Sequence, residues 1–305
     1  MKRVIVTTTV NPPTEAIQLF DSMPGWQLIV AGDLKTPVGY HLNHGIYLSP
    51  KDQEDYDKQL SDAIGWNCIQ RRNFGILMAH DLGADVIALV DDDNIPLSGW
   101  GENLVVGEEL DVELILTGLS AFDPVGATNY PQLWHRGYPL QLLSERNYGR
   151  RKAARIRVDI QADFWNGDPD IDAVCRLEHS PECDFHSEYF PIASNAMSPF
   201  NSQNTFILGT MAKDYFLFPA VGRMDDIWAS YFVQALGNRV AYFKPSVFQR
   251  RNDHDLIADM RNEYLGYECN LKLVEALAAD PESIVAFLPA KAQWAWKLYR
   301  RHFPN

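Results

Sequence analysis

The chain has 305 residues, of which 46% are apolar, so it can bury the core of one large α/β domain with or without a smaller appendage. A formal net charge of −13 repels a phosphate backbone and argues against broad nucleic-acid binding. The four cysteines contain no C-x-x-C pair, which argues against a disulfide framework or a zinc site and predicts reduced thiols.

The N-terminal apolar run over residues 4–6 is too short for a signal peptide, and no small-residue cleavage site follows it. The sequence also contains no stretch of 18 apolar residues that would predict a transmembrane helix. We therefore expect a cytoplasmic enzyme.

The first part of the chain alternates between predicted strands and helices. In chain order these are a strand over residues 4–6, a helix capped by Thr14 with Ala16, Leu19, Phe20 and Met23 on its apolar face, a strand over 28–31, helices near 52–64 and over 67–81, and a strand over 86–90. This order predicts a doubly wound α/β half-domain, in which ligands bind at the carboxyl ends of the strands.

Three aspartates follow the last of these strands directly. Residues 86–90 are all apolar, as in strands buried in a parallel sheet, and the chain continues as Asp91-Asp92-Asp93. Adjacent carboxylates raise one another's pKa unless a cation is present, and Mg²⁺ or Mn²⁺ prefers such oxygen ligands. We predict that Asp91 and Asp93 bind the metal and that Asp91 and Asp92 meet a diphosphate; the alternative is a solvated acidic turn.

The second half of the chain is predicted to be more mixed. Strands are expected over residues 112–116, 155–160, 205–208 and 239–243, a loop over 122–148, a helix over 225–236, and mostly helix from residue 256 onward. Asp225 and Asp226 fall near the start of the helix, where its dipole favours ionised carboxylates. One of them can then accept a proton, and the alternative is a plain helix cap.

Other candidate residues lie near the predicted strand ends. Thr8 follows the first strand, and Asp33 follows the second, where it can bond a uracil or ribose. Arg72 lies early on the helix before the acidic strand and can reach a diphosphate, or it can belong to an exposed basic helix surface. His254 follows the last strand as a possible metal ligand or phosphate contact, although a lone histidine is more often structural.

The C-terminal segment mixes aromatic and basic residues, including Trp294, Trp296, Lys297 and Arg300. Such a helix can rest on a membrane interface, but packing against the body of the protein is the favoured interpretation.

Taken together, five segments in the same order resemble the plant reversibly glycosylated polypeptides, also called UDP-arabinopyranose mutases, and the related STELLO-type glycosyltransferases. The segments lie between about residues 67 and 265. They are Arg72-Asn73-Phe74-Gly75, the strand ending in Asp91-Asp92-Asp93, Arg136-Gly137-Tyr138-Pro139, Trp165 with residues 169–173, and residues 222–228.

The resemblance implies a GT-A fold, a UDP-sugar or similar donor, and Mn²⁺ or Mg²⁺ at the aspartate triplet. It implies a catalytic base in the Asp225-Asp226 pair, with Asp226 slightly favoured, and, in a mutase, a transiently glycosylated arginine at Arg136. We expect a catalytic domain over residues 1–255, with a nucleotide-binding half (1–120) and an acceptor half (121–255), and a helical extension over 256–305. The expected activity is metal-dependent sugar transfer to an unknown glycan or small-molecule acceptor; the alternatives are a nucleotide-sugar mutase and a non-catalytic sugar-nucleotide-binding module.

Overall fold

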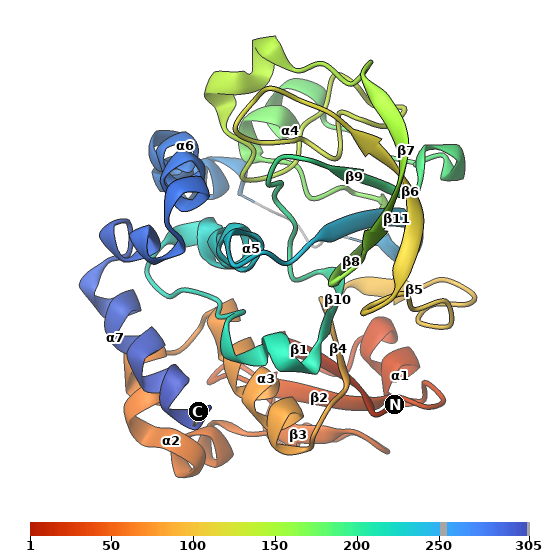
Figure 1. Cartoon of the computed structure of the whole chain (residues 1–305). Helices are drawn as coiled ribbons and strands as arrows, with labels where there is room; N and C mark the ends of the chain where they lie inside the picture. The colour runs from red at the N-terminus through yellow and green to blue at the C-terminus, as the bar shows by residue number, and fades with distance from the viewer. Residues whose placement is uncertain (251–254, 304–305) are drawn as a thin grey trace.

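The computed structural model describes residues 1–250 and 255–303. Within these residues, eleven strands form one mixed sheet in the order β3-β2-β1-β4-β10-β8-β11-β9-β6-β7, and β5 pairs with β11 off this path. Helices pack on the sheet along its length (Figure 1). The α/β class with a mixed central sheet, predicted from the order of elements, is confirmed.

The N-terminal half is a parallel, doubly wound unit. β1 pairs in parallel with both β2 and β4, and right-handed crossovers in opposite directions along the sheet place α1 and α3 on opposite faces. The carboxyl ends of β1 and β4 therefore form a topological switch point, where ligands bind in such sheets. The elements of this half are β1 (Arg3–Thr9), α1 (Glu15–Asp21), β2 (Gln27–Gly32), β3 (Ile46–Leu48), α2 (Pro50–Ile64), the 3₁₀ turn η1 (Ile69–Arg71), α3 (Arg72–Asp81) and β4 (Val86–Val90).

The second half inserts antiparallel pairs into the sheet. β10 lies antiparallel between β4 and β8, and β8 pairs in parallel with β11, so the strand that ends at the acidic triplet, β4, is joined to the second half of the chain through β10. The elements are β5 (Asn94–Pro96), β6 (Glu109–Ile115), η2 (Leu140–Glu145), β7 (Arg151–Arg157), β8 (Ile160–Gly167), α4 (Ala173–His179), η3 (Ser187–Tyr189), β9 (Ile192–Ser194), β10 (Asn204–Leu208), η4 (Gly209–Lys213), η5 (Gly222–Met224), α5 (Asp225–Ala235) and β11 (Val240–Gln249).

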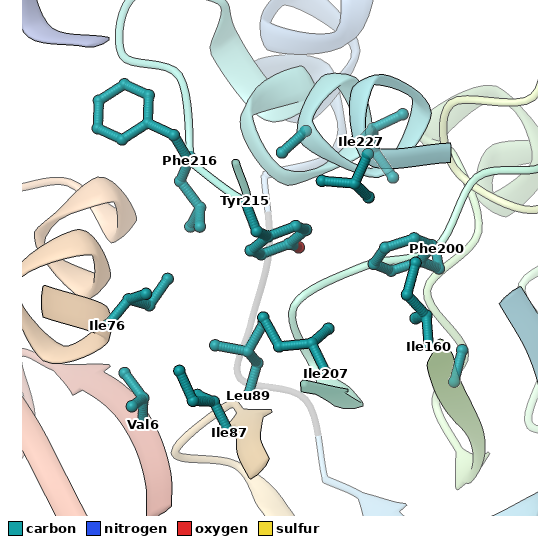
Figure 2. Close-up of a cluster of buried hydrophobic side chains, with 14 of the residues drawn as sticks. Val6, Ile76, Ile87, Leu89, Ile160, Phe200, Ile207, Tyr215, Phe216 and Ile227 are labelled. Carbon is teal, nitrogen blue, oxygen red and sulfur yellow. The ribbon is translucent and has the colours of Figure 1, made fainter. Parts of the chain in front are cut away.

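The core continues across both halves. Figure 2 shows Leu89 of β4 and Ile207 of β10 directed toward Tyr215, with Ile227 of α5 on the other side of that ring. Tyr215 stacks on Phe200 with ring centroids 5.8 Å apart, and all these side chains are buried. This continuous packing holds the ends of β4 and α5 at fixed positions relative to each other.

Two predicted elements were wrong in detail. The single strand expected over residues 155–160 is divided between β7 and β8, which lie at different places in the sheet because Val158 and Asp159 connect them through a turn. The apolar face of α1 includes Ile17 instead of Leu19, which is 40% exposed. The burial of Ala16, Ile17 and Phe20 shows that the buried face is rotated about the helix axis by less than the angle between two successive residues, compared with the predicted face.

The C-terminal segment consists of α6 (Leu256–Ala279), η6 (Pro281–Ala286), α7 (Ala290–Tyr299) and η7 (Arg300–His302). Trp296 and Tyr299 of α7 are buried, and the Tyr299 hydroxyl donates a 2.6 Å hydrogen bond to the Ala212 carbonyl. This confirms the expected packing of the last helix on the body of the protein. Among the described residues, no helix has the length and apolarity needed to cross a bilayer.

Candidate active site

A cleft of about 400 Å³ opens at the carboxyl ends of β1, β2 and β4. It brings together both predicted acidic groups, although more than a hundred residues separate them in the sequence. The predicted site residues on its wall are Thr8, Asp33, Arg72, Asp91, Asp92, Asp93, Arg136, Asp225 and Asp226. His254, the remaining predicted metal ligand, lies outside the described residues.

The acidic triplet is held at the end of β4 by its neighbours. The Asp91 carboxylate accepts a 2.6 Å ion-paired hydrogen bond from Arg72 and keeps 29% of its side chain exposed. Asp92 accepts hydrogen bonds from the Thr9 hydroxyl and, at 3.0 Å, from the Asn11 amide. Burial raises the pKa of Asp91, and the Arg72 charge opposes this rise. The triplet is therefore an ordered part of the cleft wall, and not a freely solvated turn.

Arg72 is only 1% exposed, so the alternative of an exposed basic helix surface is wrong. One terminal nitrogen donates to both the carbonyl and the hydroxyl of Ser202 at 2.6 Å, and the other donates to Asp91. Its Nε is buried and has no hydrogen-bond partner within the described part of the chain. The guanidinium thus holds β4 against the segment before β10 while one donor remains unused.

Asp33 and Thr8 shape the side of the cleft at the ends of β1 and β2. Both carboxylate oxygens of the buried Asp33 are occupied, because they accept from the backbone amides of Asn67 at 2.7 Å and Cys68 at 3.0 Å. These bonds fix the turn that leads into α3. The Thr8 hydroxyl donates to the Ala31 carbonyl at 2.7 Å, which joins the ends of β1 and β2.

The second acidic pair consists of two carboxylates in different environments. Asp225 accepts a 2.9 Å hydrogen bond from the Gln70 amide; burial and the charge of Asp226 raise its pKa to about 7. Asp226 accepts from the backbone and hydroxyl of Ser202 and from Arg136. Burial opposes the shift, but the Arg136 guanidinium holds the pKa of Asp226 below its ordinary value. Of these two carboxylates, Asp225 is the one poised to exchange a proton near neutral pH.

Arg136 is buried between two carboxylates. It donates to Asp170 through Nε at 2.9 Å and to Asp226 through both terminal nitrogens at 3.0 and 3.1 Å, and it also bonds the Arg223 carbonyl. Although burial opposes it, the two carboxylates hold the pKa of Arg136 well above its ordinary value. Each nitrogen of this guanidinium is engaged, which makes it a rigid charged support and a poor nucleophile.

Several residues of the cleft were not singled out from the sequence. Gln203 joins the two halves, because its side chain accepts from the indole of Trp165 and donates to Asn94 at 3.2 Å. Asp170 accepts from Arg136, and Gln249 lines the cleft from the end of β11. Asp170 lies in one of the resembling segments, so position in a motif was an available signal; Gln203 carries no such signal.

The donor set of the cleft suits a hard cation. Seven aspartates and three arginines line it in the described part of the chain, so a diphosphate would meet an excess of negative charge unless a divalent ion were bound. The same residues contain no cluster of three or more His, Cys, Asp or Glu side chains in a metal-binding arrangement. Mg²⁺ and Mn²⁺ sites commonly use one or two carboxylates, with phosphate and water completing the shell, and Asp91 and Asp93 fit that description.

Comparison with known proteins gives two curated relatives from Arabidopsis thaliana. The probable glycosyltransferase STELLO2 is 27% identical over 267 residues, covering 80% of this chain and 35% of its own length. The probable glycosyltransferase STELLO1 is 26% identical over 271 residues, covering 79% of this chain and 34% of its own. The resemblance to STELLO-type glycosyltransferases is thereby confirmed, and the chain spans about a third of the length of these relatives.

No protein-family model matches the chain. Among solved structures, a mycobacterial protein superimposes with a TM-score of 0.43 and 11% sequence identity, covering 89% of this chain and 75% of that one.

Proposed function

We propose that this relative of STELLO-type glycosyltransferases transfers a sugar from a nucleotide-sugar, with a uridine diphosphate sugar as the donor, to a hydroxyl group of a glycan or small-molecule acceptor. The observation that carries the proposal is the juxtaposition of two acidic groups in one cleft. Asp91-Asp92-Asp93 suits a cation and a diphosphate, and Asp225 suits an acceptor proton. The names of the two relatives support the same reaction class.

The nucleotide is assigned to the side of the cleft formed by β1 and β2, where Thr8 and Asp33 lie. Asp91 and Asp93 would hold Mn²⁺ or Mg²⁺, which would offset the negative charge of the diphosphate when bound. Arg72 adds a fixed positive charge beside Asp91. Its unused Nε–H is a suitable donor to a phosphate oxygen.

The acceptor proton is assigned to Asp225. A general base works best when its pKa lies near the working pH, and burial places the pKa of Asp225 at about 7. Asp226, which the resemblance slightly favoured, is engaged by Arg136 and Ser202. We assign Asp226 the role of orienting Arg136 and the start of α5.

A mutase working through Arg136 would need a guanidinium nitrogen that can receive a sugar. The observed nitrogens are all bonded to Asp170, Asp226 or the Arg223 carbonyl, which favours a supporting role. Incubation with a radiolabelled UDP-sugar separates the two activities. Transfer requires label on an added acceptor, whereas a stable protein-bound label that Arg136→Ala abolishes would establish the mutase.

The proposal is tested by thermal shift with UDP and a panel of UDP-sugars, with and without Mn²⁺, because ligands that bind the folded state raise its melting temperature. We expect a shift with UDP that depends on Mn²⁺. If UDP binds but no UDP-sugar is hydrolysed or transferred, a non-catalytic sugar-nucleotide-binding module becomes the better explanation. If neither UDP nor any UDP-sugar shifts the melting temperature, the protein is not this enzyme.

A further inference from the structure

Gln249 is the last residue of β11 and lines the cleft. Its backbone is fixed on both sides, in register with Asn94 of β5 and Gly167 of β8. The residue is 3% exposed, yet its side-chain Oε1 is buried without a hydrogen-bond partner among residues 1–250 and 255–303. A buried amide oxygen left without a hydrogen bond lowers the stability of the fold, so it calls for an explanation.

A neighbouring glutamine shows that the fold can satisfy a buried amide in this cleft. The Oε1 of Gln203 accepts from Trp165 at 2.5 Å and from Asn201 at 3.0 Å, while its Nε2 donates to Asn94. This second glutamine lines the same cleft and is equally buried. Since the fold satisfies one glutamine fully and leaves the other incomplete, the missing partner of Gln249 is most simply supplied by a ligand.

The position of Gln249 indicates which part of a ligand it meets. β11 is three strands from β4 and five from β2, or about 14 Å and 24 Å at a spacing of roughly 4.8 Å per strand. The Arg250 amide donates to the Asp93 carbonyl at 3.2 Å, so Gln249 lies just beyond the acidic triplet. With the nucleoside on the side of β1 and β2 and the diphosphate at the triplet, the transferred sugar extends toward Gln249.

The chemistry of the cleft around Gln249 favours a hydroxyl group of the ligand over a negatively charged group. Oε1 accepts hydrogen bonds, and a sugar hydroxyl can donate one. Asp93 and Asp170 line the same cleft and disfavour an anionic group. We infer that Gln249 is a donor-sugar-binding residue, whose buried amide oxygen accepts a hydrogen bond from a hydroxyl of the transferred sugar. This inference rests on the proposed function.

The test separates the sugar from the nucleotide. Dissociation constants are measured with Mn²⁺ for UDP and for UDP-glucose, UDP-galactose and UDP-xylose, and the ratio of the UDP value to each UDP-sugar value isolates the contribution of the sugar. In Gln249→Met, which keeps the side-chain volume but removes the amide, we expect this ratio to fall about tenfold for the preferred sugar, while UDP binds as in the unmodified protein. Gln18→Met, at an exposed glutamine of α1 that does not line the cleft, is the matched control.

Stability gives a second, independent readout. Because Gln249→Met replaces an unpartnered buried amide with an apolar group, the ligand-free variant should melt no lower than the parent; a structural role for the amide would lower the melting temperature. Gln249→Asn is measured as well, in case the methionine does not fit, and it should also lower the ratio of the UDP dissociation constant to that of the UDP-sugar. The inference is overturned if the ratio is unchanged for every sugar, or if UDP itself weakens as much as the UDP-sugars. Failure of UDP to bind the unmodified protein would instead remove the proposed function.

Discussion

The side-chain amide of Gln70 donates a 2.9 Å hydrogen bond to the carboxylate of Asp225, across 155 residues of sequence. Gln70 belongs to the turn that leads into α3, and Asp225 begins α5. The contact therefore joins the N-terminal half of the chain to the second acidic pair without placing a positive charge on Asp225. The neighbouring carboxylate, Asp226, receives Arg136 instead.

This difference between adjacent aspartates predicts different consequences of the same substitution. Asp225→Asn should reduce the rate of sugar transfer by about 10²–10⁴-fold, as for loss of a general base, with little loss of stability. Asp226→Asn should destabilise the protein by about 3–5 kcal/mol, because it leaves Arg136 incompletely paired in a buried site. Initial rates and thermal melting of both variants check the prediction, and the assignment fails if Asp225→Asn retains full turnover.

The transfer rate should depend on pH through Asp225. Since the ionised form is the base, activity should rise as pH passes through about 7, where burial places the pKa of Asp225, and then reach a plateau. A rate profile measured from pH 5 to 9 tests this. A profile that is flat between pH 6 and 8 would contradict the assignment of the proton to this residue.

Stability should change with pH in the opposite sense. The pKa of Asp225 is raised from 3.8 to about 7 on folding, so the folded protein binds this proton more tightly than the unfolded chain. Its contribution to stability is therefore lost as pH rises from about 4 through 7. Asp225→Asn cannot titrate, and its melting temperature should increasingly exceed that of the parent over this interval. If the difference in melting temperature between the two proteins stays constant with pH, the pKa of Asp225 is not raised.

Removal of one carboxylate from the triplet should weaken cation binding. One unit charge at 4 Å contributes about 1 kcal/mol in water and about 4 kcal/mol at an effective dielectric constant near 20. We therefore expect Asp93→Asn to lower the Mn²⁺ affinity of the UDP complex by about five- to a thousandfold. Calorimetric titration of Mn²⁺ into protein and UDP measures this, and Asp55→Asn on α2 is a remote control. Equal affinities for the two variants would exclude Asp93 as a ligand.

The ion pairs of the cleft also predict a preference among donors. Arg72, Arg136 and Arg223 each face a carboxylate, namely Asp91, Asp226 and Glu263. A carboxylate on the donor sugar would therefore find none of these three arginines free of an acidic partner. With Mn²⁺ present, UDP-glucose should bind at least about tenfold more tightly than UDP-glucuronic acid, a difference of about 1.4 kcal/mol. Equal binding would show that one of these arginines releases its partner.

The N-terminal half could be predicted well from the sequence because its signals are local. The apolar run at residues 86–90 and the Thr14 cap correspond to β4 and to the start of α1. β3, β5 and β9 were missed since each has only three residues, too few to establish a period. The boundary between β7 and β8 was missed because alternation continues through the turn.

The acidic groups could be predicted as separate candidates, but their meeting depends on the insertion of β10 between β4 and β8, a pairing that no local pattern encodes. The different environments of Asp225 and Asp226 depend on Gln70 and Arg136, which reach the pair from segments remote in the sequence. The cation, the donor and the domain boundary at residue 255 remain predictions, as does the cytoplasmic location.

Helix α6 has a consequence for how the protein can be shortened. Its buried Glu263 accepts from Arg223 at 2.8 Å and from the backbone of Ala173 at 2.8 Å. Two helical turns further along, the Asn270 side-chain amide donates a hydrogen bond to the Gly137 carbonyl and accepts one from the Trp228 indole, both at 2.9 Å. The helix therefore holds together the segments that carry Arg136 and Asp225. A chain ended before α6 would keep every candidate catalytic side chain and lose the scaffold that aligns them.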